Sequence, residues 1–155
     1  MKVSELFDVS GYGVIVTGGA SGIGLWYVEA LAEAVHPVMI LQHDSALSDK
    51  FRRSTASCVE LAQAGQFEEA LPFCNLAIRF SEQQSPGTSV DTSLQAAAAR
   101  TNRAVVSWLL GRDERAAADM AVAAAQSPGA SFVRKNLVVM GMEPPASTLA
   151  GGAAD

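Results

Sequence analysis

Apolar and small residues follow a helical period through the second half of the chain, and their pattern occurs twice. Each copy places a glycine between two segments whose apolar positions recur every three to four residues. The first copy contains Cys58, Gly65, Ala70, Cys74 and Ala77, and 46 residues later the second contains Ala104, Gly111, Ala116, Met120 and Ala123. A duplicated pattern of this kind predicts two helix–turn–helix units.

The same periodicity and its breaks predict five helices. They are expected at residues 51–64, 67–81, 94–110, 113–126 and 131–140. Pro, Gly and Ser residues predict a loop at 83–91, and Thr92 with Gln95 fits a capping box that would begin the third helix. The short last helix is interpreted as a cap on the array, and residues 142–155 are expected to be a disordered tail.

The first 44 residues have a different pattern. A β-branched run at 13–17 precedes a glycine-rich turn at 18–24, an amphipathic stretch at 25–34 and a second apolar run at 38–41. This order predicts a strand–helix–strand (βαβ) unit, joined to the helices by a polar linker at residues 45–50. A parallel pair of strands exposes both edges and buries little surface. We therefore expect it to dock on the helices, on a second copy of the chain as a homo-oligomer, or on another protein; the remaining alternative is that it stays partly ordered.

The words LAQAGQFEEALPFCNLAIRF (61–80) and NRAVVSWLLGRDERAAADMAVAAAQSP (102–128) resemble the tetratricopeptide repeat family. The resemblance implies a mainly α fold of antiparallel helical hairpins over residues 51–141, with two repeats and a cap helix. It also implies a non-enzymatic scaffold that binds a protein or peptide in a concave groove lined by the first helix of each repeat. By phase, the groove positions are Arg52, Thr55, Val59, Gln63, Thr101, Asn102, Val105 and Trp108.

Two of these positions have alternative interpretations. Trp108 is either an anchor for a partner or a residue packed under the cap helix or the N-terminal segment. Asn102 matches the asparagine that family members use to clamp acidic C-termini, but Thr55 and Val59 stand where its partners would be. A chaperone clamp is therefore not expected, and Arg103 is expected to be structural, bonded to a neighbouring carboxylate or carbonyl.

The stretch TGGASGIG at 17–24 resembles the cofactor fingerprint of short-chain dehydrogenases/reductases and gives the βαβ unit a partial Rossmann-like character. The resemblance implies NAD(P) contacts from Thr17, Gly18, Ser21, Gly22, Ile23 and Gly24. The family's Tyr-xxx-Lys pair and Asn-Asn-Ala-Gly motif are absent, and Gln42 stands where an acid usually reads the ribose. We therefore predict no enzyme and no required cofactor. The alternative is an NAD(P)- or phosphate-binding remnant that a partner would have to complete, and the resemblance ends near residue 44, which leaves open a fusion or truncation product.

Composition narrows the function further. The 155 residues carry a formal net charge of −5, which disfavours nucleic acid, and 49% are hydrophobic, which excludes a wholly disordered chain. The two cysteines, Cys58 and Cys74, are expected to be reduced thiols in the core, and no metal site is expected at His36 or His43. Without a run of 18 apolar residues or the apolar core of a signal peptide, the chain is expected to be cytoplasmic and not to bind a membrane.

Overall fold

The computed structural model describes residues 15–17, 39–41, 48–83 and 92–142, and this part of the chain is mainly helical, as the periodicity predicted. Within these ranges lie two strands and five helices: β1 (Ile15–Thr17), β2 (Met39–Leu41), α3 (Asp49–Gln63), α4 (Phe67–Glu82), α5 (Thr92–Leu109), α6 (Asp113–Gln126) and α7 (Ser131–Val139). None of these helices combines the length and the apolar character that a membrane span requires.

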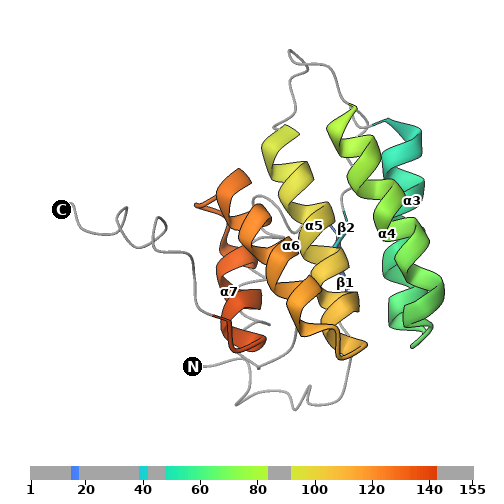
Figure 1. The fold of residues 1–155 in the computed structure, drawn as a ribbon. Coiled ribbons are helices and arrows are strands. Elements are labelled where there is room, and N and C mark those ends of the chain that lie inside the picture. The colour runs from blue at the N-terminus through green and yellow to red at the C-terminus, as the bar shows by residue number, and fades with distance from the viewer. Residues whose placement is uncertain (1–14, 18–38, 42–47, 84–91, 143–155) are drawn as a thin grey trace, which may run out of the picture.

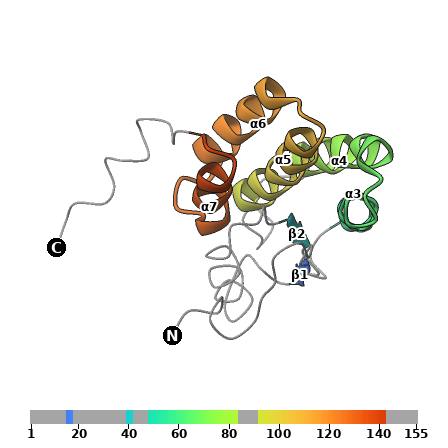
Figure 2. The same cartoon turned by 90° about the horizontal axis from the view of Figure 1, so that it is seen from below.

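The helices pack in chain order as an array (Figure 1). α3 packs against α4, α4 against α5 and α5 against α6, while α7 contacts both α5 and α6. Both strands lie on one side of this array, beneath α5 and beside α3 (Figure 2). β2 therefore contacts α3 and α5, the helices that the sequence assigned to the first half of each repeat.

The turns that close α3 and α5 depend on the predicted glycines. Gly65 and Gly111 have φ angles of 77° and 69°, a left-handed conformation that costs other residues about 1–2 kcal/mol. The N–H of the residue after each glycine donates to the C=O five residues earlier, at 2.9 Å, which satisfies a carbonyl left over at the helix end. α7 ends in the same way at Gly141. A glycine C-cap is thus what allows each helix to turn sharply.

The predicted helix boundaries agree closely with the structure, but one predicted capping interaction does not form. α6 has the predicted bounds, and α3 begins two residues early because the Ser48 side chain accepts a hydrogen bond from the Phe51 N–H at 3.2 Å. The capping box predicted at Thr92 and Gln95 is wrong. Gln95 lies on a buried face of α5, 1% exposed, so its amide does not turn back to cap the helix.

The duplicated positions form the core of the helical array. The small or apolar side chains of both copies are at most 2% exposed: Cys58, Ala70, Cys74, Ala77, Ala104, Ala116, Met120 and Ala123. Alanine at most of these positions lets neighbouring helices approach closely while it retains high helix propensity. The pattern that predicted the helices therefore also predicted which faces pack.

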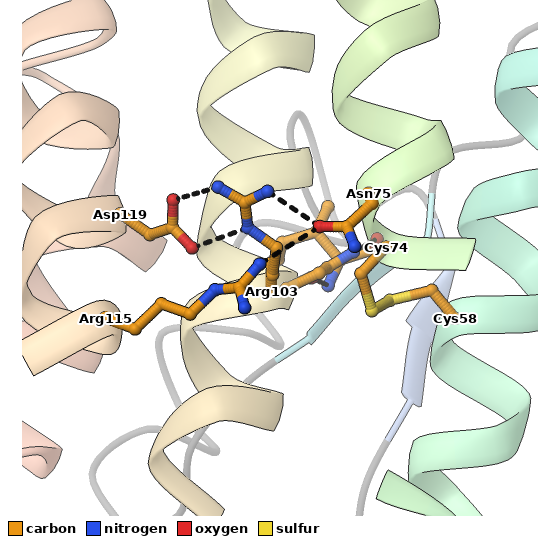
Figure 3. Close-up of a disulfide and its surroundings, with 8 residues drawn as sticks. Cys58, Cys74, Asn75, Arg103, Arg115 and Asp119 are labelled. Atoms are coloured by element: carbon orange, nitrogen blue, oxygen red, sulfur yellow. Dashed lines mark hydrogen bonds and ion pairs between the residues drawn. A yellow bond between two sulfur atoms is a disulfide. The ribbon is translucent and has the colours of Figure 1, made fainter. Parts of the chain in front are cut away.

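A disulfide joins α3 to α4 (Figure 3). Cys58 and Cys74 are linked with their Cα atoms 5.0 Å apart, so the prediction of two reduced thiols is wrong. The reason is geometric, because the hairpin that turns at Gly65 brings the two buried positions opposite each other, well within the range that a disulfide spans. The second copy has Ala104 and Met120 at the corresponding places and therefore has no such link.

The disulfide predicts that the purified, denatured protein reacts with no alkylating reagent until it is reduced. Mass spectrometry should detect no iodoacetamide adduct without reductant and two adducts after reduction. Replacing both cysteines by alanine should lower the free energy of unfolding by about 3 kcal/mol, the loss expected for a loop of this length. Two adducts in the unreduced protein would show that the thiols are free.

Candidate functional site

The two strands form a short parallel sheet whose second strand packs on the helices. β1 pairs with β2 in a register that places Val16 beside Ile40, and β2 contacts both α3 and α5. The sequence predicted both strands, although at 13–17 and 38–41 they were expected to be longer. Residues 18–38, which join them, lie outside the described ranges, so the connecting helix stays a prediction.

The residues proposed for cofactor binding follow the same boundary. Thr17 is the last residue of β1, whereas Gly18, Ser21, Gly22, Ile23 and Gly24 lie outside the described residues. Nucleotide binding by this sequence therefore stays a prediction. In the ranges that the structure does describe, no cluster of three or more His, Cys, Asp or Glu side chains could hold a metal ion.

Asn102 of α5 forms two hydrogen bonds with the backbone of Ile40. The Ile40 N–H donates to Asn102 Oδ1 at 2.7 Å, and Asn102 Nδ2 donates to the Ile40 C=O at 2.7 Å. Ile40 is 0% exposed and Asn102 1%, so water does not compete for these bonds. One side-chain amide therefore satisfies both backbone groups of a buried residue 62 positions away along the chain.

This contact closes one edge of the sheet. In a strand, the N–H and C=O groups of one residue point to the same edge, and those of the next residue point to the opposite edge. Because both groups of Ile40 pair with Asn102, they point to the edge away from β1. An unpaired edge invites other strands to add to it. Asn102 occupies the edge as one residue of a third strand would. Another strand could pair at Ile40 on this edge only by displacing Asn102, and self-association through the strands stays a prediction.

The surroundings of Ile40 are apolar and come from both repeats. Met39 and Ile40 share one buried cluster with Val59 of α3 and with Ala98 and Val105 of α5. Ala98, Asn102 and Val105 lie at helical spacings of four and three residues, so they share one side of α5. We call the surface formed by Val59, Ala98, Asn102 and Val105 the inner face. The inner face contacts β2 through apolar side chains and through the Asn102 amide, which forms hydrogen bonds with the backbone of β2.

Five of the eight predicted groove residues are buried. Asn102 binds Ile40, and Val59 and Val105 belong to the inner face. Thr101 donates to the Ala97 C=O of its own helix at 2.8 Å. The Thr55 hydroxyl has no hydrogen-bond partner among the residues that the structure describes, although Thr55 is 2% exposed. The structure thus brings Val59, Asn102 and Val105 together at one site.

The other three predicted groove residues are less enclosed. Gln63 is exposed, and Trp108 is half-buried and packs against the core cluster that contains Ile40. Arg52 is half-buried and forms a hydrogen bond and an ion pair with Asp49, one turn earlier in α3. That hydrogen bond, together with the charge of Arg52, lowers the pKa of the exposed Asp49 carboxyl. Arg52 is thus paired within its own helix.

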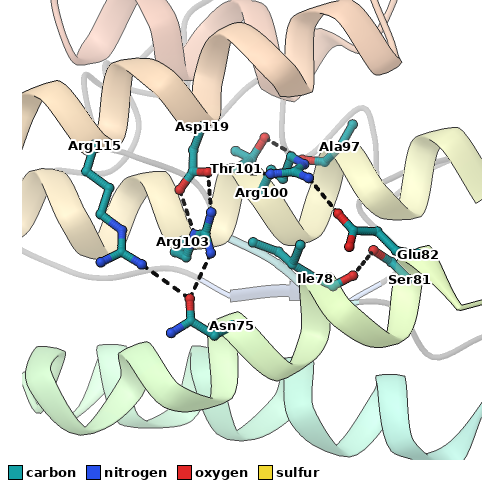
Figure 4. A network of polar contacts seen from close by, with 10 residues as sticks. All are labelled: Asn75, Ile78, Ser81, Glu82, Ala97, Arg100, Thr101, Arg103, Arg115 and Asp119. Atoms are coloured by element: carbon teal, nitrogen blue, oxygen red, sulfur yellow. Dashed lines mark hydrogen bonds and ion pairs between the residues drawn. The ribbon is translucent and has the colours of Figure 1, made fainter.

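Arg103 connects three helices through its side chain (Figures 3 and 4). Its guanidinium donates to both oxygens of Asp119 at 2.7 and 2.6 Å and to Asn75 Oδ1 at 2.8 Å, which ties α5 to α6 and α4. Arg100 bonds Glu82 at 2.6 Å and lies 3.8 Å from Asp119. The structural role predicted for Arg103 is confirmed, because its charge is neutralised by a buried carboxylate.

Gln95 is a residue of this site that the sequence analysis misassigned. It lies seven residues before Asn102, two helical turns away on the same side of α5. Within the described ranges, neither its amide oxygen nor its amide nitrogen has a hydrogen-bond partner, although the residue is 1% exposed. Two amides at a spacing of seven on an otherwise alanine-rich helix are the signal that could have identified it.

Comparisons with known proteins add no assignment to this geometry. No family model, no curated protein and no solved structure matches the chain. The functional argument therefore rests on the residues of the inner face and on the strand that they hold.

Replacing Asn102 by leucine should destabilise the protein more than a matched change beside it. The leucine fills the space but leaves the N–H and C=O of Ile40 unpaired, which costs about 1–3 kcal/mol. Thr101→Val is the control, since it removes only a bond within α5 and should cost about 1 kcal/mol or less. Both values are measured by urea unfolding followed by circular dichroism. Equal losses would show that Asn102 contributes no more than an ordinary buried polar residue.

Proposed function

We propose that the chain is a non-enzymatic interaction scaffold whose inner face binds an extended peptide segment of a partner protein. The main support for this proposal is the pair of 2.7 Å hydrogen bonds between Asn102 and the backbone of Ile40. A side chain that reads both groups of one residue recognises an extended backbone whatever the side chain of that residue is. This is the chemistry of strand addition, performed by an amide on a helix.

The apolar part of the site supports the same proposal. Val59 and Val105 occupy corresponding positions in the two copies, and both belong to the cluster that encloses Ile40. An aliphatic side chain at the ligand position that Ile40 fills would be removed from water, which supplies most of the favourable free energy. The backbone pairing would then fix the direction and register of the ligand.

The helical array is well suited to act as a rigid support for this site. The disulfide links α3 to α4, and Arg103 links α5 to α4 through Asn75 and to α6 through Asp119. Because both inner-face helices are held by their neighbours, Val59 and Asn102 keep their relative positions without a ligand. A site that is organised before binding loses less conformational entropy when it binds. The tetratricopeptide-like arrangement of two repeats and a cap remains the fold proposal that fits these contacts.

The compartment is a separate proposal. The lack of a long apolar run and of a signal-peptide core predicted a cytoplasmic protein, but disulfides persist mainly in oxidising compartments. Because the Cys58–Cys74 link is a specific contact, we favour an oxidising compartment. Alkylation of thiols in acid-quenched cells decides this, since a reduced pair in the living cell would support the cytoplasm instead.

Binding of a synthetic peptide tests the proposed function. The probe carries residues 38–42 (VMILQ) between pairs of lysines, and its matched control has a methyl group on the isoleucine amide nitrogen. The methyl group removes the N–H that Asn102 accepts and leaves the side chain unchanged. We expect saturable binding of the probe in fluorescence anisotropy, and affinity about tenfold lower for the methylated peptide, because one hydrogen bond of this kind contributes about 1.4 kcal/mol.

The protein variants complete this test. Because Asn102 pairs with β2 as it would with the probe, the readout is the ratio of the affinities for the unmodified and methylated peptides. Asn102→Leu should bind the two peptides equally, whereas Thr101→Val should keep the difference of about tenfold. Equal binding of the two peptides by the unmodified chain would show that the chain does not recognise an extended backbone, and the proposed function would fail.

A further inference from the structure

β2 occupies the inner face in the manner of a bound peptide. It is three residues long, its central residue is fully buried, and its backbone is read by Asn102. In sequence it is joined to α3 by residues 42–48, a stretch that is mostly polar. The chain therefore presents to its own inner face a segment with the properties that the proposed ligand requires.

The inner side of α5 extends beyond the part that β2 satisfies. Gln95 lies on the same side of the helix as Asn102, about 10.5 Å away along the axis, because seven residues rise by about that distance. Both of its polar atoms lack a partner within the part of the chain that the structure describes. An unsatisfied buried amide is costly, and an extended backbone that passed Gln95 could pair with it as β2 pairs with Asn102.

We infer that β2 is an internal competitor, and that the partner is a longer extended segment that displaces β2 and pairs with both Asn102 and Gln95. This inference rests on the proposed function. The residues of the inner face, Val59, Ala98, Asn102 and Val105, carry no charge. The partner segment therefore has an aliphatic residue where Ile40 now lies and no charged residue beside it.

The length of this segment follows from the spacing of the two amides. An extended chain rises about 3.3 Å per residue, so three to four residues separate the two points of contact. A segment of about seven residues would cover both amides, whereas β2 has three. The additional amide pair gives a partner segment an advantage that β2 lacks.

The inference requires β2 to reduce the affinity of the chain for any segment in solution. Apparent affinity falls in proportion to the fraction of molecules whose site is open. If β2 covers the inner face in more than nine-tenths of the molecules, releasing it raises the affinity for a partner peptide at least about tenfold. The inner face would then bind a partner segment only after β2 has left it.

The first experiment releases β2 in the full chain. Ile40→Asp places a charge in the apolar cluster and should raise affinity for the lysine-flanked VMILQ probe at least about tenfold. Val138→Asp is the control, because Val138 is 77% exposed on α7, and it should change nothing. Equal affinities of Ile40→Asp and the unmodified chain would overturn the competition by β2 while leaving the proposed function intact. If neither the unmodified chain nor Ile40→Asp binds the probe, the proposed function itself is overturned.

Binding kinetics of the unmodified chain keep the inference testable if Ile40→Asp loses its helical structure. When a site must open before it binds, the observed association rate approaches a plateau as the peptide concentration rises. We expect this plateau in stopped-flow anisotropy. A rate that keeps rising linearly with peptide concentration would overturn the competition.

The role of Gln95 is tested with two peptide lengths. The long probe extends VMILQ by Thr-Val-Thr at each end, and the short probe is VMILQ alone between lysines. Gln95→Leu should weaken binding of the long probe about tenfold and leave the short probe unchanged. The same result for both probes, whether a loss or no effect, would overturn the second contact point.

Discussion

A buried backbone N–H or C=O group needs a hydrogen-bond partner, and at Ile40 both groups find theirs in the side chain of Asn102. Without this amide, the edge of β2 would be buried against α5 with two unsatisfied polar groups. The position of the sheet therefore depends in part on one side chain of α5. Because Ile40 also belongs to the main core cluster, this contact joins the N-terminal strands to the helical array.

The helical array provides the surface on which this contact forms. Glycine turns allow α3 and α5 to lie beside their following helices, and small side chains let these helices pack closely. The outer contacts are polar and specific, as Arg103 shows by joining three helices through Asp119 and Asn75. The inner contacts are apolar apart from Asn102. α3 and α5 therefore contact their neighbouring helices on one side and β2 on the other.

The helices were predictable from the sequence because their signals are local. Glycine at 65 and 111 and the Ser-Pro-Gly sequence at 127–129 mark ends that the structure reproduces, and the bounds of α6 agree with the prediction. Burial of Cys58 and Cys74 was predictable from the same period, but their disulfide was not. A separation of 16 residues is no recognised motif, and it becomes a link only when the hairpin sets the two Cα atoms 5.0 Å apart.

The candidate site was predictable only in part, for a related reason. Phase within the repeat placed Val59, Asn102 and Val105 in one predicted groove, and all three are buried in the structure. It could not show that the segment beside Asn102 comes from position 40 of the same chain, since no period connects residues 62 positions apart. Gln95 was assigned to a helix cap because that motif is local, whereas its burial is set by packing.

Hydrogen exchange of the Ile40 amide, followed by nuclear magnetic resonance, tests the central claim most directly. An amide that is buried and bonded exchanges only when the structure around it opens. In the unmodified chain, Ile40 should exchange far more slowly than an unstructured amide, and Asn102→Leu should remove this protection while amides within α6 keep theirs. Exchange of Ile40 at the unstructured rate in the unmodified chain would contradict the account.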